Sequence, residues 1–300
     1  MPNPASMSMP RVHAQLLLAR SLVATSFIVG ALITHGLAPE RLTLVRFALA
    51  TLVFAPYIVW RHGWSIPSPR QFAGYAAISA CLVVFFWCMF EALRLTSSLN
   101  AAALFTMMPC VSALYAAVLV RERLGGLRLT ALILGAVGAL WVIFRGDMQL
   151  LLGLAFNRGD LIFLGGVCAM ALYTPLVRRF SRGEPAAVMS FWVLATGTVW
   201  LLLLNNRAVF ETDWIAVDWD VYAGIAYLAI FPTIISFFII QHATLRLGPT
   251  RVMAYGYLTP ALVVGIEWAL GRGLPDPILL PGVAIIVAAM FVIQAGVKKG

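Results

Sequence analysis

The chain has 300 residues, of which 62% are hydrophobic and only 11% are charged, and its net charge is +9. Soluble globular chains have roughly 45–50% apolar and about 25% charged residues, so this composition excludes a soluble enzyme and a disordered chain. The basic residues form no contiguous stripe on a soluble face, so no nucleic-acid partner is expected.

Ten apolar segments follow one another along the chain, each of about 20–25 residues and therefore long enough to cross a ~30 Å hydrocarbon core. The first is too long for the apolar core of a signal peptide. We therefore expect an all-α polytopic membrane protein with ten transmembrane helices, solvated by the lipid bilayer. The predicted spans are 14–36, 38–60, 70–95, 97–119, 126–145, 160–181, 186–206, 219–243, 248–270 and 276–297.

The basic residues predict an orientation for these spans. With a cytoplasmic amino terminus, 13 of the 21 Lys and Arg residues fall in cytoplasmic segments and 6 on the other side, while Arg20 and Arg46 lie within spans. This bias obeys the positive-inside rule. It predicts a multi-pass protein of the cell (inner) membrane with both termini in the cytoplasm.

A weak internal repeat has an offset near 150 residues. Phe85-Phe86 recurs as Phe237-Phe238, and Pro109 recurs as Pro260. We interpret residues 11–146 and 159–297 as two repeats of five spans each. Because five is odd, the second repeat would enter the membrane inverted, as in secondary transporters that work by alternating access.

Short motifs in a fixed order give the chain a family resemblance. They are Pro39, Arg46-Phe47-Ala48, the stretch 101–109, Arg121-Glu122-Arg123-Leu124, Gly159-Asp160 and Pro260. In this order the sequence resembles the EamA-type ten-helix transporters of the drug/metabolite transporter superfamily, with the aromatic amino-acid exporter branch as the more specific suggestion. It departs from the family pattern at Gly273, where a second glutamate would stand. The resemblance implies a cavity lined by spans 1–4 and 6–9, with spans 5 and 10 peripheral.

Aromatic and hydroxyl side chains within the central spans are candidates for solute binding, because ligand sites combine apolar walls with a few polar groups. Arg46 has two interpretations. It could hold a substrate carboxylate through two parallel hydrogen bonds, or form a structural ion pair with Glu91 or Glu267, which we favour. Arg20 is expected to extend toward the membrane surface. The candidates are Arg46, Trp87, Glu91, Asn100, Thr106, Tyr173, Tyr227, Ser236, Tyr255 and Tyr257.

Prolines within spans remove a backbone donor and kink the helix, which favours gates at Pro109, Pro175, Pro232 and Pro260 over purely structural kinks. His242 and Glu267 are the candidates for proton coupling, since histidine titrates near neutral pH. For His242, a role as a polar cap at the membrane interface is the more common alternative.

No catalytic triad or metal-ligand spacing appears, and the four cysteines all lie in apolar runs. We therefore expect no enzyme activity, metal or cofactor. The predicted function is secondary transport, in the export direction, of small organic metabolites, with amino acids including aromatic ones favoured. A sugar-phosphate or nucleotide-sugar carrier is the alternative, and a membrane-embedded enzyme is the alternative from another class.

The predicted fifth span carries Ala131, Gly135 and Ala139 at intervals of four residues. Small residues at this spacing allow helices to approach closely. Packing within the bundle is the favoured interpretation. The alternative is a second subunit, so the protein would be a monomer or a homodimer through spans 5 and 10.

Overall fold

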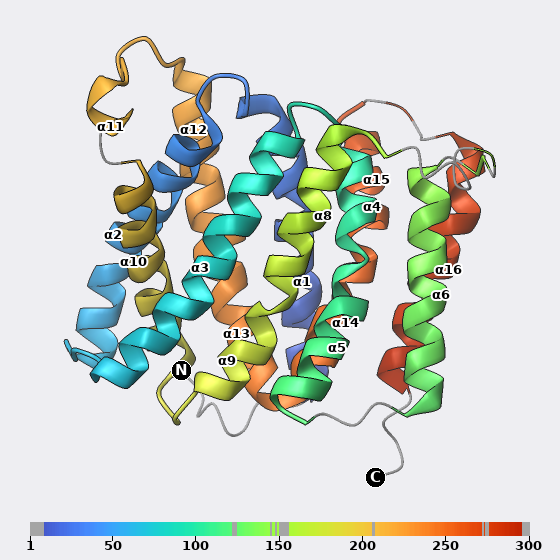
Figure 1. Cartoon of the computed structure of the whole chain (residues 1–300), viewed down its shortest axis with the longest axis horizontal. Helices are drawn as coiled ribbons and strands as arrows, with labels where there is room; N and C mark the ends of the chain where they lie inside the picture. Colours follow the sequence, from blue (N-terminus) through green and yellow to red (C-terminus); the bar gives the residue numbers. More distant parts are fainter. Residues whose placement is uncertain are drawn as a thin grey trace.

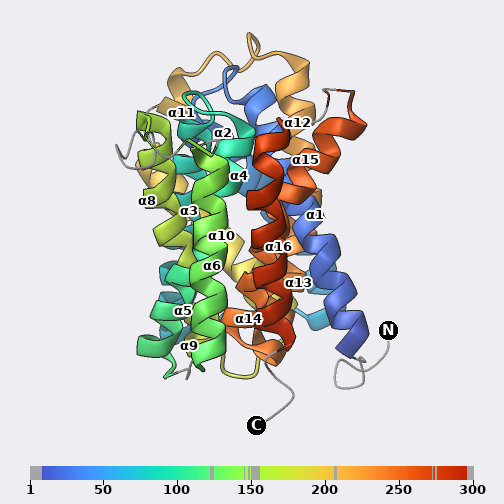
Figure 2. The same cartoon turned by 90° about the vertical axis from the view of Figure 1, so that its right-hand side faces the viewer.

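The computed structural model is a bundle of antiparallel helices, and no strand occurs in its described part (Figure 1). The structure describes residues 9–121, 125–144, 146, 147, 149, 156–205, 208–271, 273 and 276–295. Residues 122–124 of the family motif and the end of the second predicted repeat, 296 and 297, lie outside this set. Both α1 (Met9–Ile33), where it begins, and α16 (Leu280–Ala295), where it ends, lie at the lower end of the bundle (Figure 2). We call this the terminal end, and the opposite end the far end.

Between these two helices the chain passes repeatedly from one end to the other. The remaining elements are α2 (Pro39–His62), α3 (Pro69–Ala92), α4 (Ser98–Phe105), α5 (Met108–Leu119), α6 (Gly126–Ile143), α8 (Arg158–Ala171), α9 (Tyr173–Phe180), α10 (Ala186–Leu204), α11 (Ala208–Glu211), α12 (Trp219–Ala229), the π-helix η2 (Ile230–Ile235), α13 (Ser236–Leu247), α14 (Pro249–Ala254), the 3-10 helices η3 (Tyr255–Leu258) and η4 (Pro277–Leu279), and α15 (Thr259–Ala269).

In the described part of the chain, eight helical segments are long and apolar enough to cross a membrane, which makes this a multi-pass membrane protein. They lie on the predicted spans 1–4 and 6–9. The two remaining predictions, spans 5 and 10, correspond to shorter apolar helices, Leu129–Val142 and Pro277–Ile293. These belong to α6 and α16, which run side by side at one edge of the bundle (Figures 1 and 2).

The contact between α6 and α16 depends on glycine. A Cβ atom at Gly138 would lie 2.8 Å from the carbonyl oxygen of Gly282, and one at Gly282 would lie 2.8 Å from that of Gly138. One turn away, a Cβ at Gly135 would lie 2.5 Å from the ring of Tyr257. Small residues of α6, Gly135 among them, are therefore used for packing within the bundle. This is the interpretation that we favoured for the small residues of the predicted fifth span. The side chain of Ala139 lies outside the described part.

All four predicted proline positions lie at helix irregularities. Pro109 and Pro260 each stand in the first turn of a new helix, α5 and α15, where the missing backbone donor has no helical partner to lose. Pro232 lies inside the π-helix η2, and Pro175 follows the break between α8 and α9. The structure thus has a helix boundary or a π-helix at each of these prolines, whereas their role as gates stays a prediction.

Two carboxylates tie α3 to later segments at opposite ends of the bundle. At the far end, Asp160 accepts a hydrogen bond from the hydroxyl of Thr96 at 2.8 Å, and with Asn157 it forms a capping box at the start of α8. At the terminal end, the hydroxyl of Tyr75 donates to Glu184 at 3.0 Å. The long contact between α3 and α8–α9 is therefore fastened at both membrane faces.

We expect Asp160→Ala to lower the free energy of unfolding by about 0.5–2 kcal/mol, because the substitution removes one half of the capping box at the start of α8 and the acceptor of the Thr96 hydroxyl. The carboxylate is only 3% exposed, whereas its donors on Thr96 and Asn157 are partly exposed. The measurement is the apparent unfolding temperature in detergent. Asp160→Asn, which keeps an acceptor oxygen, is the control, and an equal loss in both variants would show that the hydrogen bonds of the carboxylate are not the cause.

Candidate functional site

A cluster of buried aromatic rings occupies the centre of the bundle. Phe86 lies 5.6 Å from Phe47 and 6.1 Å from Phe237, and Phe237 lies 5.8 Å from Tyr173, measured between ring centroids. A second branch passes from Phe86 through Phe85 to Phe105, Phe163 and Phe27. These rings come from seven helices of both predicted repeats, α1, α2, α3, α4, α8, α9 and α13.

Arg46 brings a positive charge to the edge of this aromatic cluster. Its side chain is completely buried, and its guanidinium carbon lies 4.1 Å from the centroid of the Phe86 ring. A cation at this distance is attracted by the negative face of the ring. Its Nε–H donates to the hydroxyl of Thr233 at 2.8 Å, whereas Nη1 and Nη2 have no hydrogen-bond partner among the described residues. The two terminal nitrogens of the guanidinium are therefore available to donate hydrogen bonds to an anion.

Thr233 orients this guanidinium and was not among the predicted site residues. It lies in η2, and its hydroxyl donates to the carbonyl oxygen of Leu228, five residues earlier, at 2.7 Å while it accepts from Arg46. Single π-turns inside α-helices often occur at functional sites. The available signal in the sequence was the hydroxyl directly after Pro232, the proline predicted to kink this span.

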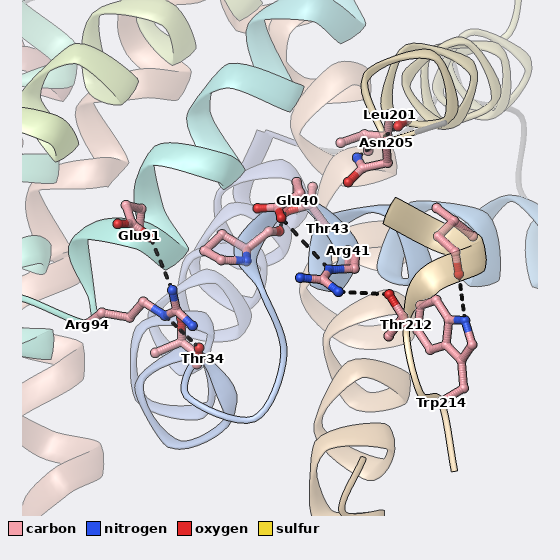
Figure 3. A network of polar contacts seen from close by, with 12 residues as sticks. Thr34, Glu40, Arg41, Thr43, Glu91, Arg94, Leu201, Asn205, Thr212 and Trp214 are labelled. Carbon is pink, nitrogen blue, oxygen red and sulfur yellow. Dashed lines mark hydrogen bonds and ion pairs between the residues drawn. The ribbon is translucent and has the colours of Figure 1, made fainter. Parts of the chain in front are cut away.

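The favoured ion pair between Arg46 and a glutamate is wrong for the described residues. Figure 3 shows Arg94 between Glu91, at 3.5 Å, and the carbonyl oxygen of Thr34, which accepts its Nε–H at 3.0 Å. Glu91 is therefore paired locally at the far end, with an arginine three residues later in the turn that follows α3. Glu267 is half-buried near the end of α15 and forms no ion pair with Arg46.

The far end holds further polar contacts that fasten the segment after α10. Arg41 lies 3.8 Å from Glu40, and its Nη1 donates to the hydroxyl of Thr212 at 2.8 Å (Figure 3). Trp214 donates to the carbonyl oxygen of Val209. These groups are partly exposed and lie outside the aromatic cluster.

The predicted tyrosines have separate surroundings. Tyr173 is part of the aromatic cluster. The hydroxyl of Tyr227 donates to Thr25 of α1 at 2.9 Å, and that of Tyr255 bonds to the ring nitrogen of His13, also on α1. Tyr257 donates to the carbonyl oxygen of Leu132 at 3.0 Å, so it anchors α6 to η3 rather than lining the centre.

The other predicted site residues lie apart from Arg46 or bond to their own helices. Trp87 is 43% exposed, on the same face of α3 as Val84, so the structure does not bring it into the buried aromatic cluster. Thr106 and Ser236 are buried and donate to the carbonyl oxygens of Ala103 and Pro232. Asn100 is half-buried in the first turn of α4, where its backbone N–H donates to Ser97.

Two further ionisable residues lie in the predicted spans, His242 and Arg20. His242 is half-buried one turn from Phe238, whose ring lies 6.3 Å away, and its role in proton coupling stays a prediction. Arg20 does not extend to the membrane surface as expected, since it is only 1% exposed. Among the described residues, no group of three His, Cys, Asp or Glu side chains could hold a metal ion.

Comparison with known sequences identifies the family of this chain. The profile of the EamA-like transporter family matches the chain twice, over residues 12–144 and 157–295. The chain belongs to the EamA-like transporter family. Its family membership and apolar helices together make it a membrane transporter, and its relatives are likewise named as transporters.

Individual relatives are distant but cover most of the chain. The uncharacterized transporter YyaM of Bacillus subtilis is 22% identical over 256 residues, covering 84% of each chain. A protein of Streptantibioticus cattleyicolor named "Probable terminal-alkyne amino-acid exporter" is 29% identical over 267 residues, covering 86% of this chain and 83% of that one. A solved crystal structure at 20% identity superposes with a TM-score of 0.73 and covers 98% of this chain and 100% of its own, which supports the fold alone.

Proposed function

We propose that this transporter exports small amino-acid-like carboxylates by alternating access, with Arg46 as the group that binds the carboxylate. The observation that carries the proposal is the pair of unpartnered Nη atoms on a completely buried guanidinium. Guanidinium and carboxylate match in a two-point hydrogen-bonded pair. Ionisable side chains in a membrane interior are costly, so an unpaired one indicates a functional role.

The surroundings of Arg46 favour a solute with an apolar or aromatic side chain. Phe86 lies next to the guanidinium, Phe47 and Phe237 pack against Phe86, and Phe237 continues the row toward Tyr173. Flat rings would pack against an aromatic side chain while the fork holds its carboxylate. The relative from Streptantibioticus cattleyicolor, named as an amino-acid exporter, agrees with this class of solute.

A sugar-phosphate or nucleotide-sugar carrier fits less well. Phosphate groups call for clustered cations, and the described buried residues include two arginines, Arg20 and Arg46, with separate partners.

In the proposed transporter, α6 and α16 complete ten membrane spans, and residues 11–146 and 159–297 form two inverted repeats. The protein lies in the inner membrane of the cell, with its terminal end facing the cytoplasm.

Uptake of radiolabelled phenylalanine and threonine into proteoliposomes tests the proposal. We expect flux above that of empty liposomes, and inhibition by unlabelled phenylalanine but not by phenylalaninamide, which lacks the carboxylate and keeps the ring. Equal inhibition by the acid and the amide would contradict the role of Arg46. Absence of flux for a broad panel of amino acids would contradict the class of solute.

A further inference from the structure

The second buried arginine, Arg20, points into the protein from the middle of α1. Its Nη2 donates to the carbonyl oxygen of Val252 at 2.9 Å and lies 3.9 Å from the sulfur of Met253. Both partners lie in α14, just before the 3-10 turn η3 that interrupts this segment. One end of the guanidinium is therefore held by the broken helix, at a carbonyl close to the end of α14.

The positive charge of Arg20 has no balancing carboxylate among the described residues. The ion pairs Glu40–Arg41 and Glu91–Arg94 lie at the far end. The Nε–H of Arg20 is buried and has no hydrogen-bond partner. A single carbonyl, even one near a helix end with its partial negative charge, compensates little of the desolvation cost of a buried cation, which is several kcal/mol.

The position of Arg20 sets it apart from Arg46. At a rise of about 1.5 Å per residue, Arg20 lies about 20 Å below the far end of α1, whereas Arg46 lies about 10 Å below the far end of α2. Arg20 is thus the deeper of the two toward the terminal end. Two turns further along α1 toward that end, His13 bonds to Tyr255 of the same 3-10 turn.

We propose that Arg20 is a second anion-binding station, which receives the carboxylate of the solute on the terminal-end side of Arg46. The proposal rests on the proposed function, because it assigns the same solute to both stations. A solute that enters from the terminal end meets Arg20 first and Arg46 second. The guanidinium of Arg46 bonds to Thr233 in η2, and that of Arg20 bonds to Val252 in α14, directly before η3.

The test counts anion sites in purified protein by thermal unfolding, with benzoate as the probe and benzamide as its neutral counterpart. A ligand that binds only the folded state raises the unfolding temperature. In Arg46→Gln we expect benzoate, and not benzamide, to raise the unfolding temperature by a few degrees, because the Arg20 station remains. The double variant Arg20→Gln/Arg46→Gln should show no such rise.

The Arg46→Gln measurement needs no substitution at Arg20, so it stands even where the double variant does not fold. Loss of all benzoate-dependent stabilisation in Arg46→Gln would overturn the proposal and leave Arg20 as a cap of the Val252 carbonyl. Stabilisation of Arg46→Gln by chloride but not by benzoate would also overturn it, since the site would then hold an inorganic anion. Because the readout is binding, it is independent of whether amino-acid flux is found.

Discussion

Arg46→Lys should raise the half-saturating concentration of the transported carboxylate about 10- to 100-fold. Lysine keeps the positive charge but lacks the planar fork, so the two Nη atoms, which have no hydrogen-bond partner among the described residues, are replaced by a single point charge. A charge-assisted hydrogen bond contributes about 1.5–3 kcal/mol, which corresponds to this range of affinity. Transport kinetics in proteoliposomes provide the measurement.

Arg41→Lys is the matched control for this experiment. Arg41 is also on α2, but it is partly exposed at the far end, where it bonds to Thr212 and lies near Glu40. We expect its kinetics to stay within about twofold of the wild type, because exposed ion pairs contribute little. Equal kinetics for Arg46→Lys and Arg41→Lys would remove Arg46 from the binding site.

A single methyl group at Gly138 should destabilise the protein. In Gly138→Ala the new Cβ would lie 2.8 Å from the carbonyl oxygen of Gly282, and this neighbour is backbone, so it cannot turn away. Overpacking of this kind costs about 1–3 kcal/mol. We expect a lower apparent unfolding temperature, with α6 and α16 separating first.

Gly265→Ala is the control, and its expected effect on stability has the opposite sign. Gly265 also lies in a helix, α15, but a Cβ atom there meets no other atom within 4 Å. Alanine favours a helix over glycine by about 1 kcal/mol, so this variant should be equally stable or more stable. A lower unfolding temperature in both variants would show that loss of glycine itself, rather than the close approach, is responsible.

The membrane class and the positions of the helix breaks could be predicted from the sequence, because both follow from local properties. Apolar length shows in single segments, and Pro109, Pro175, Pro232 and Pro260 act on their own helices. Spans 5 and 10 were predicted as long as the rest, and within the described residues their apolar helices are Leu129–Val142 and Pro277–Ile293.

The site was less predictable, because side-chain partners depend on packing between distant segments. Arg46 was identified by its charge, but its partner Thr233 is 187 residues away and was missed. Trp87 was selected as an aromatic residue, yet the rotation of α3 turns it outward while Phe85 and Phe86 face the centre. Arg20 was expected near the surface because it lies close to one end of the predicted span 14–36, whereas in the structure it is buried against α14.

The distance along the chain between each buried arginine and its partner has a consequence for biosynthesis. Arg20 precedes Val252 by 232 residues, and Arg46 precedes Thr233 by 187. At a synthesis rate of about 5–20 residues per second, each arginine is made roughly 10–45 s before its partner. The first half of the chain is therefore synthesised with two arginines whose hydrogen-bond partners are made only in the second half, so these two hydrogen bonds can form only after most of the protein has been synthesised.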